Sequence, residues 1–240
     1  MNKIKQQLWD EYKYRIELHA HTSPVSPCAE CSPEEVVEAY YKKGYDAIVI
    51  TNHYANFLMM EESQKEAVDR YLVDYNRAKT KGDECGLTVI LGVEYRFAES
   101  QNDFLIYGVD REILETLYDY RNVEIEDFKK EVTFPDSVMI QAHPFRNGNS
   151  PCDPSLIDGI ETFNMHPGHN ANIGFAVRHA YENNIPIMTA GSDFHHKGER
   201  HECVSALRTK VLPRDSFELA QILKSGDYIL EIGENSLVLP

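Results

Sequence analysis

The segment YRIELHAHT, residues 14–22, joins a strand pattern to a pair of histidines. Apolar and polar side chains alternate from Tyr14 to Leu18, which predicts a β-strand. His19 and His21 follow two residues apart, so the strand period turns both imidazoles to one face, where they can hold one metal ion. Two histidines that each satisfy a local hydrogen bond would show the same spacing, so the rest of the chain has to distinguish these alternatives.

Four further groups of histidines and carboxylates fall just after short apolar runs. Residues that follow parallel strands lie at the carboxyl edge of a sheet, so we expect these distant segments to meet in one pocket. Imidazole and carboxylate ligands suit zinc, manganese or iron and can leave a position open for water. The pattern predicts a polynuclear metal site that combines His19 and His21 with Asn52-His53, Glu94, His143-Pro144 and Asp193-Phe194-His195.

The segments between these groups follow a β-α-β rhythm. Ser32-Pro33-Glu34-Glu35 predicts a capped helix that runs to about Lys43 and ends at Gly44. The series favours one α/β domain over residues 1–240 with a closed or nearly closed barrel, although an open doubly wound sheet would give much the same pattern. The other expected helices are 61–79, 172–183 and 217–224, and the other expected strands are 47–50, 87–93, 104–109, 138–142, 159–163, 186–190 and 228–232.

The net charge of −15 at pH 7 limits the partners of the chain. An acidic protein repels phosphate backbones over long range, which argues against a nucleic-acid polymer as partner. A small phosphorylated substrate remains compatible, because bound divalent cations would reverse the local field at the site. The sequence does not indicate an oligomeric state.

Several features lead us to expect a cytoplasmic protein. No run approaches the roughly 18 consecutive apolar residues of a membrane span, and the segment from Met1 to Asp10 lacks the apolar core of a signal peptide. The five cysteines are an odd number in a long acidic chain, which does not suit a disulfide framework. We therefore expect a reducing compartment and no membrane partner.

The motifs together resemble those of the polymerase and histidinol phosphatase (PHP) family of metal-dependent phosphoesterases, from about Ile16 to about His195. They occur in the order that the family shows. The matching segments are His19-Ala20-His21-Thr22, Ile50-Thr51-Asn52-His53, Gly92-Val93-Glu94, Ala142-His143-Pro144, Gly159-Ile160-Glu161 and Gly191-Ser192-Asp193-Phe194-His195.

The resemblance implies a distorted β/α barrel of about seven strands, with two to three divalent metal ions (Zn, Mn or Fe) at the carboxyl ends of the strands. By the same resemblance Glu94 would bridge two ions. The implied ligands are His19, His21, Glu94 and Asp193 for the first ion, His143 for the second with a residue from 161–169, and His53 and His195 for the third. For the open position we favour His166 over Glu161 and His169.

The sequence departs from the family pattern at two positions. Cys28 stands where many members carry an acidic residue or a histidine, and it could replace that ligand or be a small buried hydrophobe. Asn52 stands where aspartate is frequent, and its amide can still accept a hydrogen bond from an imidazole N–H.

Two positions are candidates for substrate binding. Arg146 follows His143 closely enough to reach the same pocket, and its planar fork suits a phosphate, although a surface salt bridge is the alternative. His196 forms a basic patch with Lys197 and Arg200 beside the last motif.

These residues predict hydrolysis of a small phosphate monoester or diester by a metal-bound hydroxide, since cations lower the pKa of water towards ~7. Asp193 or a nearby histidine would manage the proton. A binuclear amidohydrolase acting on a C–N bond and a non-catalytic metal-binding module are the alternatives. We expect a free-standing protein, because 240 residues leave no room for a polymerase and the charge disfavours DNA.

Overall fold

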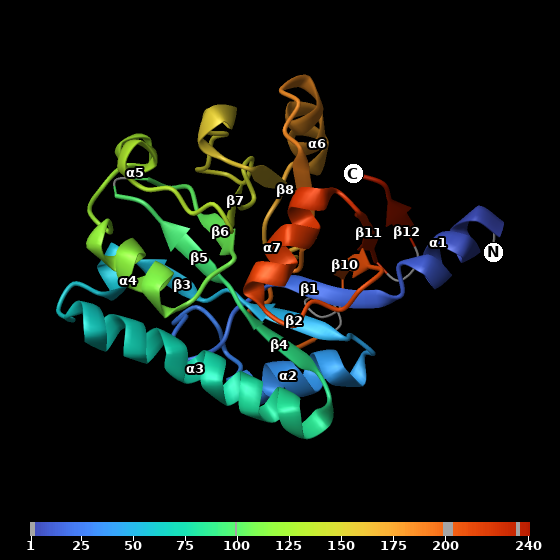
Figure 1. The fold of residues 1–240 in the computed structure, drawn as a ribbon, viewed down its shortest axis with the longest axis horizontal. Coiled ribbons are helices and arrows are strands. Elements are labelled where there is room, and N and C mark those ends of the chain that lie inside the picture. Colours follow the sequence, from blue (N-terminus) through green and yellow to red (C-terminus); the bar gives the residue numbers. More distant parts are fainter. Residues whose placement is uncertain (1–2, 99, 199–203, 234–235) are drawn as a thin grey trace.

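The computed structural model describes residues 3–98, 100–198, 204–233 and 236–240, and these residues form an α/β fold with two mixed sheets (Figure 1). In the described residues each sheet has six strands. The first has the order β12 (Ser236–Val238), β11 (Tyr228–Ile232), β10 (Ser205–Thr209), β1 (Tyr14–Ala20), β2 (Ala47–Ile50) and β4 (Thr88–Leu91). The second has the order β3 (His53–Ala55), β5 (Val93–Arg96), β6 (Phe104–Tyr107), β7 (Val138–Gln141), β8 (Gly159–Asn164) and β9 (Ile187–Gly191).

The helices flank these sheets. α2 begins with the capping box that the sequence predicts, because Ser32 accepts from Glu35 N while the Glu35 carboxylate accepts from Ser32 N. α2 and α3 run along one side of the molecule, below β2 and β4 in Figure 1. The described helices are α1 (Lys3–Glu11), α2 (Pro33–Lys42), α3 (Gln64–Cys85), α4 (Arg111–Asp119), α5 (Ile125–Glu131), α6 (Ile173–Glu182) and α7 (Ser216–Ser225), with short 3-10 helices η1 (Asn56–Leu58) and η2 (Pro154–Leu156).

Hydrogen bonds join the two sheets at two seams. At one seam β2 leads into β3 and β4 into β5, and Glu94 N donates to Asn52 O at 3.1 Å. At the other seam Ala20 forms a parallel bridge with Phe194, just after β9. The ends of β1, β5 and β9 therefore lie close to one another.

The predicted strand 87–93 is divided at Gly92. A Cβ on Gly92 would lie 2.7 Å from Val49 Cγ1 and 2.9 Å from Thr51 Cγ2, so this backbone approaches β2 more closely than any other residue would allow. The residues before Gly92 join the first sheet as β4 and those after it join the second as β5. The local pattern could not show this change of sheet.

Strand direction is a second difference from expectation. β6 runs antiparallel to both β5 and β7, within a sheet whose other pairs, β3 with β5, β7 with β8 and β8 with β9, are parallel. The residue before β6 therefore lies at the same edge as the residues after β5 and β7. Local periodicity also missed β3, β10, β12, α1 and α4, which are short or weakly patterned.

One part of the core lies between the two sheets. Leu18 of β1 and Val49 of β2 belong to the same buried cluster as Leu105 of β6 and Ile140 of β7, and Leu219 of α7 joins them. This packing fixes the positions of the strand ends that carry the histidines and carboxylates.

None of the helices among the described residues is both long and apolar enough to span a bilayer.

Candidate metal centre

The strand ends bring the histidine and carboxylate motifs to one place. Each residue follows or belongs to a strand that ends at this edge, and the inner members are 2% exposed or less. Those inner members are His19 and His21 from β1, Glu94 from β5, His143 after β7 and Asp193 after β9. His53 and His195 lie beside them.

Three side chains place ligand atoms around Nε2 of His19. His19 Nε2 lies 3.1 Å from His21 Nε2, 3.3 Å from Glu94 Oε1 and 3.4 Å from Asp193 Oδ1. His21 Nε2 lies 3.4 Å from the same Asp193 oxygen. Ligand atoms held about 2.1 Å from one ion in tetrahedral geometry lie about 3.4 Å apart, so the spacing fits a zinc-sized cation.

Glu94 provides a further test of this fit. Its Oε2 atom is buried and makes no hydrogen bond, although it lies 2.8 Å from His53 Nδ1 and 3.3 Å from His21 Nε2. A buried oxygen without a hydrogen bond costs about 1–3 kcal/mol, and more when charged. A divalent cation bound between the imidazoles and this carboxylate would remove that cost.

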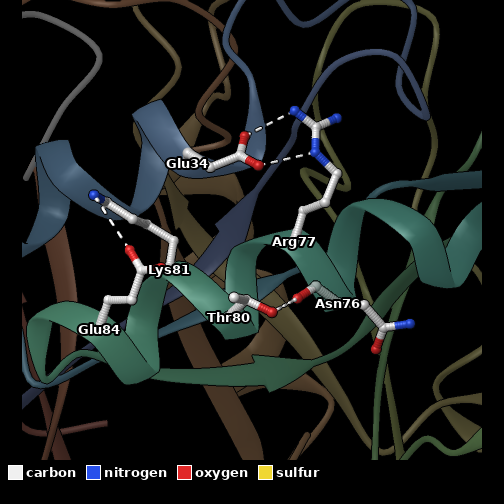
Figure 2. Close-up of a pocket in the computed structure, with 6 residues that line it drawn as sticks. All are labelled: Glu34, Asn76, Arg77, Thr80, Lys81 and Glu84. Carbon is white, nitrogen blue, oxygen red and sulfur yellow. Dashed lines mark hydrogen bonds and ion pairs between the residues drawn. The ribbon is translucent and has the colours of Figure 1, made fainter.

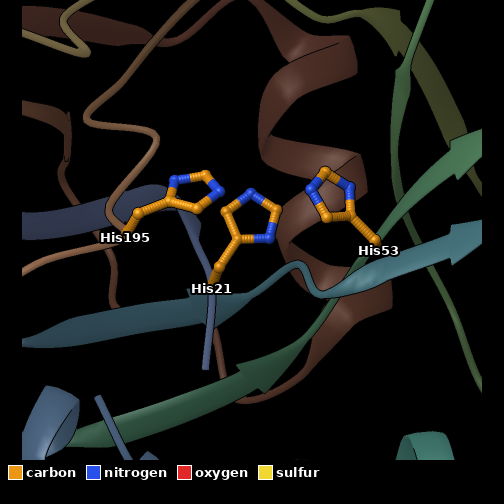
Figure 3. A group of neighbouring side chains, drawn as sticks. All are labelled: His21, His53 and His195. Atoms are coloured by element: carbon orange, nitrogen blue, oxygen red, sulfur yellow. The ribbon is translucent and has the colours of Figure 1, made fainter. Parts of the chain in front are cut away.

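A second cluster adjoins the first. Figure 3 shows the His21 ring between those of His195 and His53, and the ring centroids lie 4.3 Å and 4.5 Å from His21. One ring nitrogen from each of the three lies within 4.8 Å of the others. Burial raises the pKa of the exposed Cys28 thiol, but hydrogen bonds with His195 and His53 outweigh it and lower the pKa to about 6.

The electrostatics keep both central carboxylates ionised. Burial favours the neutral acids, but His53 and His19 outweigh it and hold the pKa of Glu94 well below its usual range. Burial likewise opposes ionisation of Asp193, whose pKa is held low by His19, His21 and Arg146. The centre therefore carries two buried negative charges.

Glu161 orients the site. Its Oε1 lies 2.9 Å from His19 Nδ1, and its Oε2 accepts from His143 N and Asn164 Nδ2. A carboxylate on Nδ1 turns the Nε2 lone pair of His19 toward the cluster. Neither His166, which the sequence analysis favoured, nor Glu161 belongs to a group of ligand atoms among the described residues, so that preference stays a prediction; the ring centroid of His166 is 5.4 Å from that of His195.

The ring proton of His143 lies on the opposite nitrogen from that of His19. Asn149 Nδ2 donates to His143 Nδ1 at 3.0 Å, which leaves the ring proton on Nε2, 3.1 Å from Glu94 Oε1. Binding of an ion at His143 Nε2 therefore requires Asn149 to release Nδ1. His143 and Asp193 also have positive φ angles of 31° and 52°, which is strained backbone typical of functional sites.

The family follows from comparison of the whole chain. The model of the PHP domain matches residues 17–233. The chain belongs to the PHP family. The motifs that resemble those of this family are the ones that meet at the strand ends.

The curated relatives that this PHP domain matches are much longer proteins. It is 26% identical over 165 residues to the PolC-type DNA polymerase III of Streptococcus sanguinis, which is 69% of this chain and 10% of that protein. The chain thus spans about a tenth of the length of the curated relatives it matches.

Two solved structures share the fold. A two-domain protein from Bacteroides vulgatus, described as containing a predicted PHP-like metal-dependent phosphoesterase, superposes with a TM-score of 0.59 at 16% identity and covers 92% of this chain and 65% of that one. PsfC from Pseudomonas syringae gives a TM-score of 0.60 at 13% identity, over 95% of this chain and 91% of that one.

Asp103, which our sequence analysis missed, lies beside the candidate metal ligands of this PHP domain. A carboxylate oxygen of Asp103 forms a group with His53 and Glu94, while both its oxygens accept from Arg96 at 2.7 Å. Asp103 precedes β6, and only the antiparallel direction of β6 brings it to this edge. An acidic residue directly before an apolar run was the available signal.

The two predicted substrate residues differ in position. Arg146 Nη2 contacts Asp193 Oδ2 and lies 3.1 Å from Asn164 Oδ1, and its Nε atom is buried without a hydrogen bond. His196 Nδ1 lies 3.2 Å from Glu30, at the surface. Arg200, the third member of the expected basic patch, lies outside the described residues, as does Cys203.

Gly191 is required by the close approach of Glu161 and His19. A Cβ at Gly191 would collide with Glu161 Oε1 and with His19 Cβ. We expect Gly191→Ala to separate this pair and to weaken zinc binding about tenfold or more, measured by competition with a chelating dye. Gly174→Ala is the control, because a Cβ there meets nothing within 4 Å. Equal zinc affinity in the two variants would contradict this role of Gly191.

Proposed function

We propose that this PHP domain hydrolyses a small phosphate monoester or diester with the help of two to three divalent cations. The carrying observation is that His21, Glu94 and Asp193 each place a ligand atom 3.1–3.4 Å from Nε2 of His19, a spacing that suits ligands of a shared ion. Glu94 would contact more than one ion, because its two oxygens face different imidazoles, with His143 on Oε1 and His53 on Oε2. His195 would complete the set with His53.

Bound cations would supply Lewis acidity, lowering the pKa of water and neutralising phosphoryl oxygens. Around them, Glu161 holds the His19 ring and thereby its Nε2 atom in place. Asp193 stays ionised beside His19 and Arg146, and we propose that it or a nearby histidine receives the proton of an attacking water molecule.

Arg146 is the residue that we propose binds the substrate phosphate, because one of its N–H donors is not yet used. Its Nη2 atom is engaged by Asp193 and Asn164, while its Nε–H is buried without a hydrogen bond. A guanidinium with a free donor beside the metal ligands suits a phosphoryl oxygen, and it would add positive charge as the transition state forms. His196 lies at the surface beside Glu30, so we assign it only a contact with the outer part of the substrate.

We also propose that the two sheets act together as the distorted β/α barrel of about seven strands, within a single domain over residues 1–240. The seams support this, because β2 leads into β3 and β4 leads into β5 across the two sheets, and the bridge from Ala20 to Phe194 connects β1 to the chain after β9. The metal site then lies at the carboxyl ends of the barrel strands.

Cys28 is proposed as a ligand of the ion held by His53 and His195, because these two histidines lower the pKa of its thiol to about 6, which favours the thiolate. Protein loaded with Co²⁺ should show a thiolate-to-metal charge-transfer band that disappears in Cys28→Ser. Cys85→Ser is the control, since Cys85 Sγ contacts Gly82 O at the far end of α3. A band that survives in Cys28→Ser would remove Cys28 from the ligand set.

The test of function is a substrate panel with Mn²⁺, Zn²⁺ or Fe²⁺ added to chelator-treated protein. Release of phosphate from small monoesters, or cleavage of diesters, supports the proposal. Hydrolysis of amides alone would favour the C–N alternative, and metal binding without any turnover would favour the binding module. Single-stranded DNA belongs in the panel because of the PolC-type relatives, and the net charge of −15 leads us to expect no cleavage of it.

A further inference from the structure

A chain of buried hydrogen bonds leads from α3 to the imidazole of His21. Thr22 Oγ1 donates to Asp74 Oδ2 at 3.1 Å and accepts from Asn52 Nδ2 at 2.7 Å. Ser26 Oγ donates to Asn52 Oδ1 at 2.9 Å and lies 3.1 Å from His21 Nδ1. All five residues are 0% exposed, so the protein itself has to satisfy their donors and acceptors.

A backbone amide fixes the orientation of the Asn52 side chain. The N–H of Thr22 can only donate, and Asn52 Oδ1 accepts from it at 2.7 Å. Oδ1 is thus the atom toward Ser26, and the Nδ2 group donates to the Thr22 hydroxyl. The Thr22 hydroxyl in turn directs its own proton to Asp74.

The outer end of the chain is anchored by fixed donors. Asp74 Oδ2 also accepts from Val25 N at 3.1 Å, and Asp74 Oδ1 lies 3.5 Å from Arg77 Nη1. Figure 2 shows the same Arg77 in a surface hollow between α2 and α3, where Glu34 binds it through two hydrogen bonds. Asp74 therefore acts as an acceptor throughout.

The Ser26 hydroxyl determines whether the His21 imidazole donates or accepts at Nδ1. Its single proton goes to Asn52 Oδ1, because otherwise two lone-pair atoms would face each other at 2.9 Å. Ser26 Oγ also accepts from the backbone N–H of His53 at 2.9 Å. The remaining contact with His21 Nδ1 is a hydrogen bond only if His21 donates it.

We propose that Asn52, acting through Ser26, is a positioning residue that holds His21 as the tautomer protonated on Nδ1. The Nε2 lone pair then faces Glu94 and Asp193, which is the form in which an imidazole binds a metal ion. This tautomer is not shared by every histidine of the site, since Asn149 imposes the other form on His143. The inference rests on the metal site of the proposed function, but the tautomer can be observed without metal.

The experiment uses metal-free protein labelled with ¹⁵N in histidine, below its unfolding temperature. Long-range ¹H–¹⁵N correlations show which ring nitrogen of His21 carries the proton, and His21→Gln assigns the signals. We expect a predominantly Nδ1-protonated His21 in the unmodified protein, and in Asn52→Leu and Ser26→Ala a mixture enriched in the Nε2-protonated form, which Glu94 and Asp193 favour. Zinc affinity should fall about tenfold or more in both variants.

Two further variants separate positioning from packing. Asn52→Asp keeps an acceptor for Ser26 and should keep both the tautomer and the zinc affinity. Thr51→Val removes a neighbouring buried hydroxyl that bonds only Ala20 backbone atoms, and should leave the His21 signals unchanged. If Asn52→Leu does not fold, the His21 tautomer and the zinc affinity of Ser26→Ala test the proposal.

The inference is overturned if His21 keeps a single tautomer in Ser26→Ala, or if Asn52→Asp shows the same mixture as Asn52→Leu. A protein that shows the expected tautomers but binds none of Zn²⁺, Mn²⁺ and Fe²⁺ would instead disprove the proposed function.

Discussion

Glu94→Gln is expected to reduce phosphate-ester hydrolysis by about a thousandfold, or ~4 kcal/mol of transition-state stabilisation. Glutamine has the same shape but carries no charge, and its amide group cannot replace both carboxylate oxygens as metal ligands. Glu94 contacts His19, His21, His53 and His143, so the change affects every proposed ion. Metal content by elemental analysis and kcat with a responsive ester measure the effect.

Glu231→Gln is the matched control for Glu94→Gln. Glu231 is an equally buried carboxylate that pairs with Arg208 at 2.6 Å and Arg15 at 3.1 Å, away from the histidines. The Glu231→Gln variant should be less stable, because Arg208 and Arg15 lose their charged partner, while its kcat and metal content stay unchanged. Retention of activity by Glu94→Gln, or equal loss in both variants, would contradict the proposed site.

Removal of the bound ions is expected to lower the melting temperature by about 10 °C. A ligand at a thousandfold excess over its Kd stabilises the fold by about 4 kcal/mol, and 1 kcal/mol corresponds to about 2–4 °C for a domain of this size. Once the cations leave, the buried charges of Glu94 and Asp193 depend on the neighbouring histidines and Arg146 for compensation. Differential scanning calorimetry with and without a chelator measures the shift.

Two controls accompany the chelation experiment. Readdition of Zn²⁺ should restore the original melting temperature, which excludes irreversible damage. Glu94→Gln should respond little to the chelator, because its ions are already weakly held. If elemental analysis shows that metal has left and the melting temperature does not move, ions at this site do not stabilise the fold.

The capping box and most strand positions were predictable because they depend on local patterns. Ser32 and Glu35 stand in the order that caps a helix, and the apolar runs before His19, His143 and Asp193 become β1, β7 and β9 as expected. Asp103 was not predictable, because its place depends on the antiparallel direction of β6. The break at Gly92 likewise depends on how closely two strands approach.

The sequence by itself determined the family and the chemical types at the strand ends, since imidazole and carboxylate residues in that order are a linear property of the chain. Only the tertiary structure decided how they pair. Glu161 rather than His166 lies against His19, and Asn52 reaches His21 through Ser26 instead of contacting an imidazole directly. Such pairings depend on hydrogen-bond distances of about 3 Å between residues far apart in the chain, and no local pattern of residues specifies them.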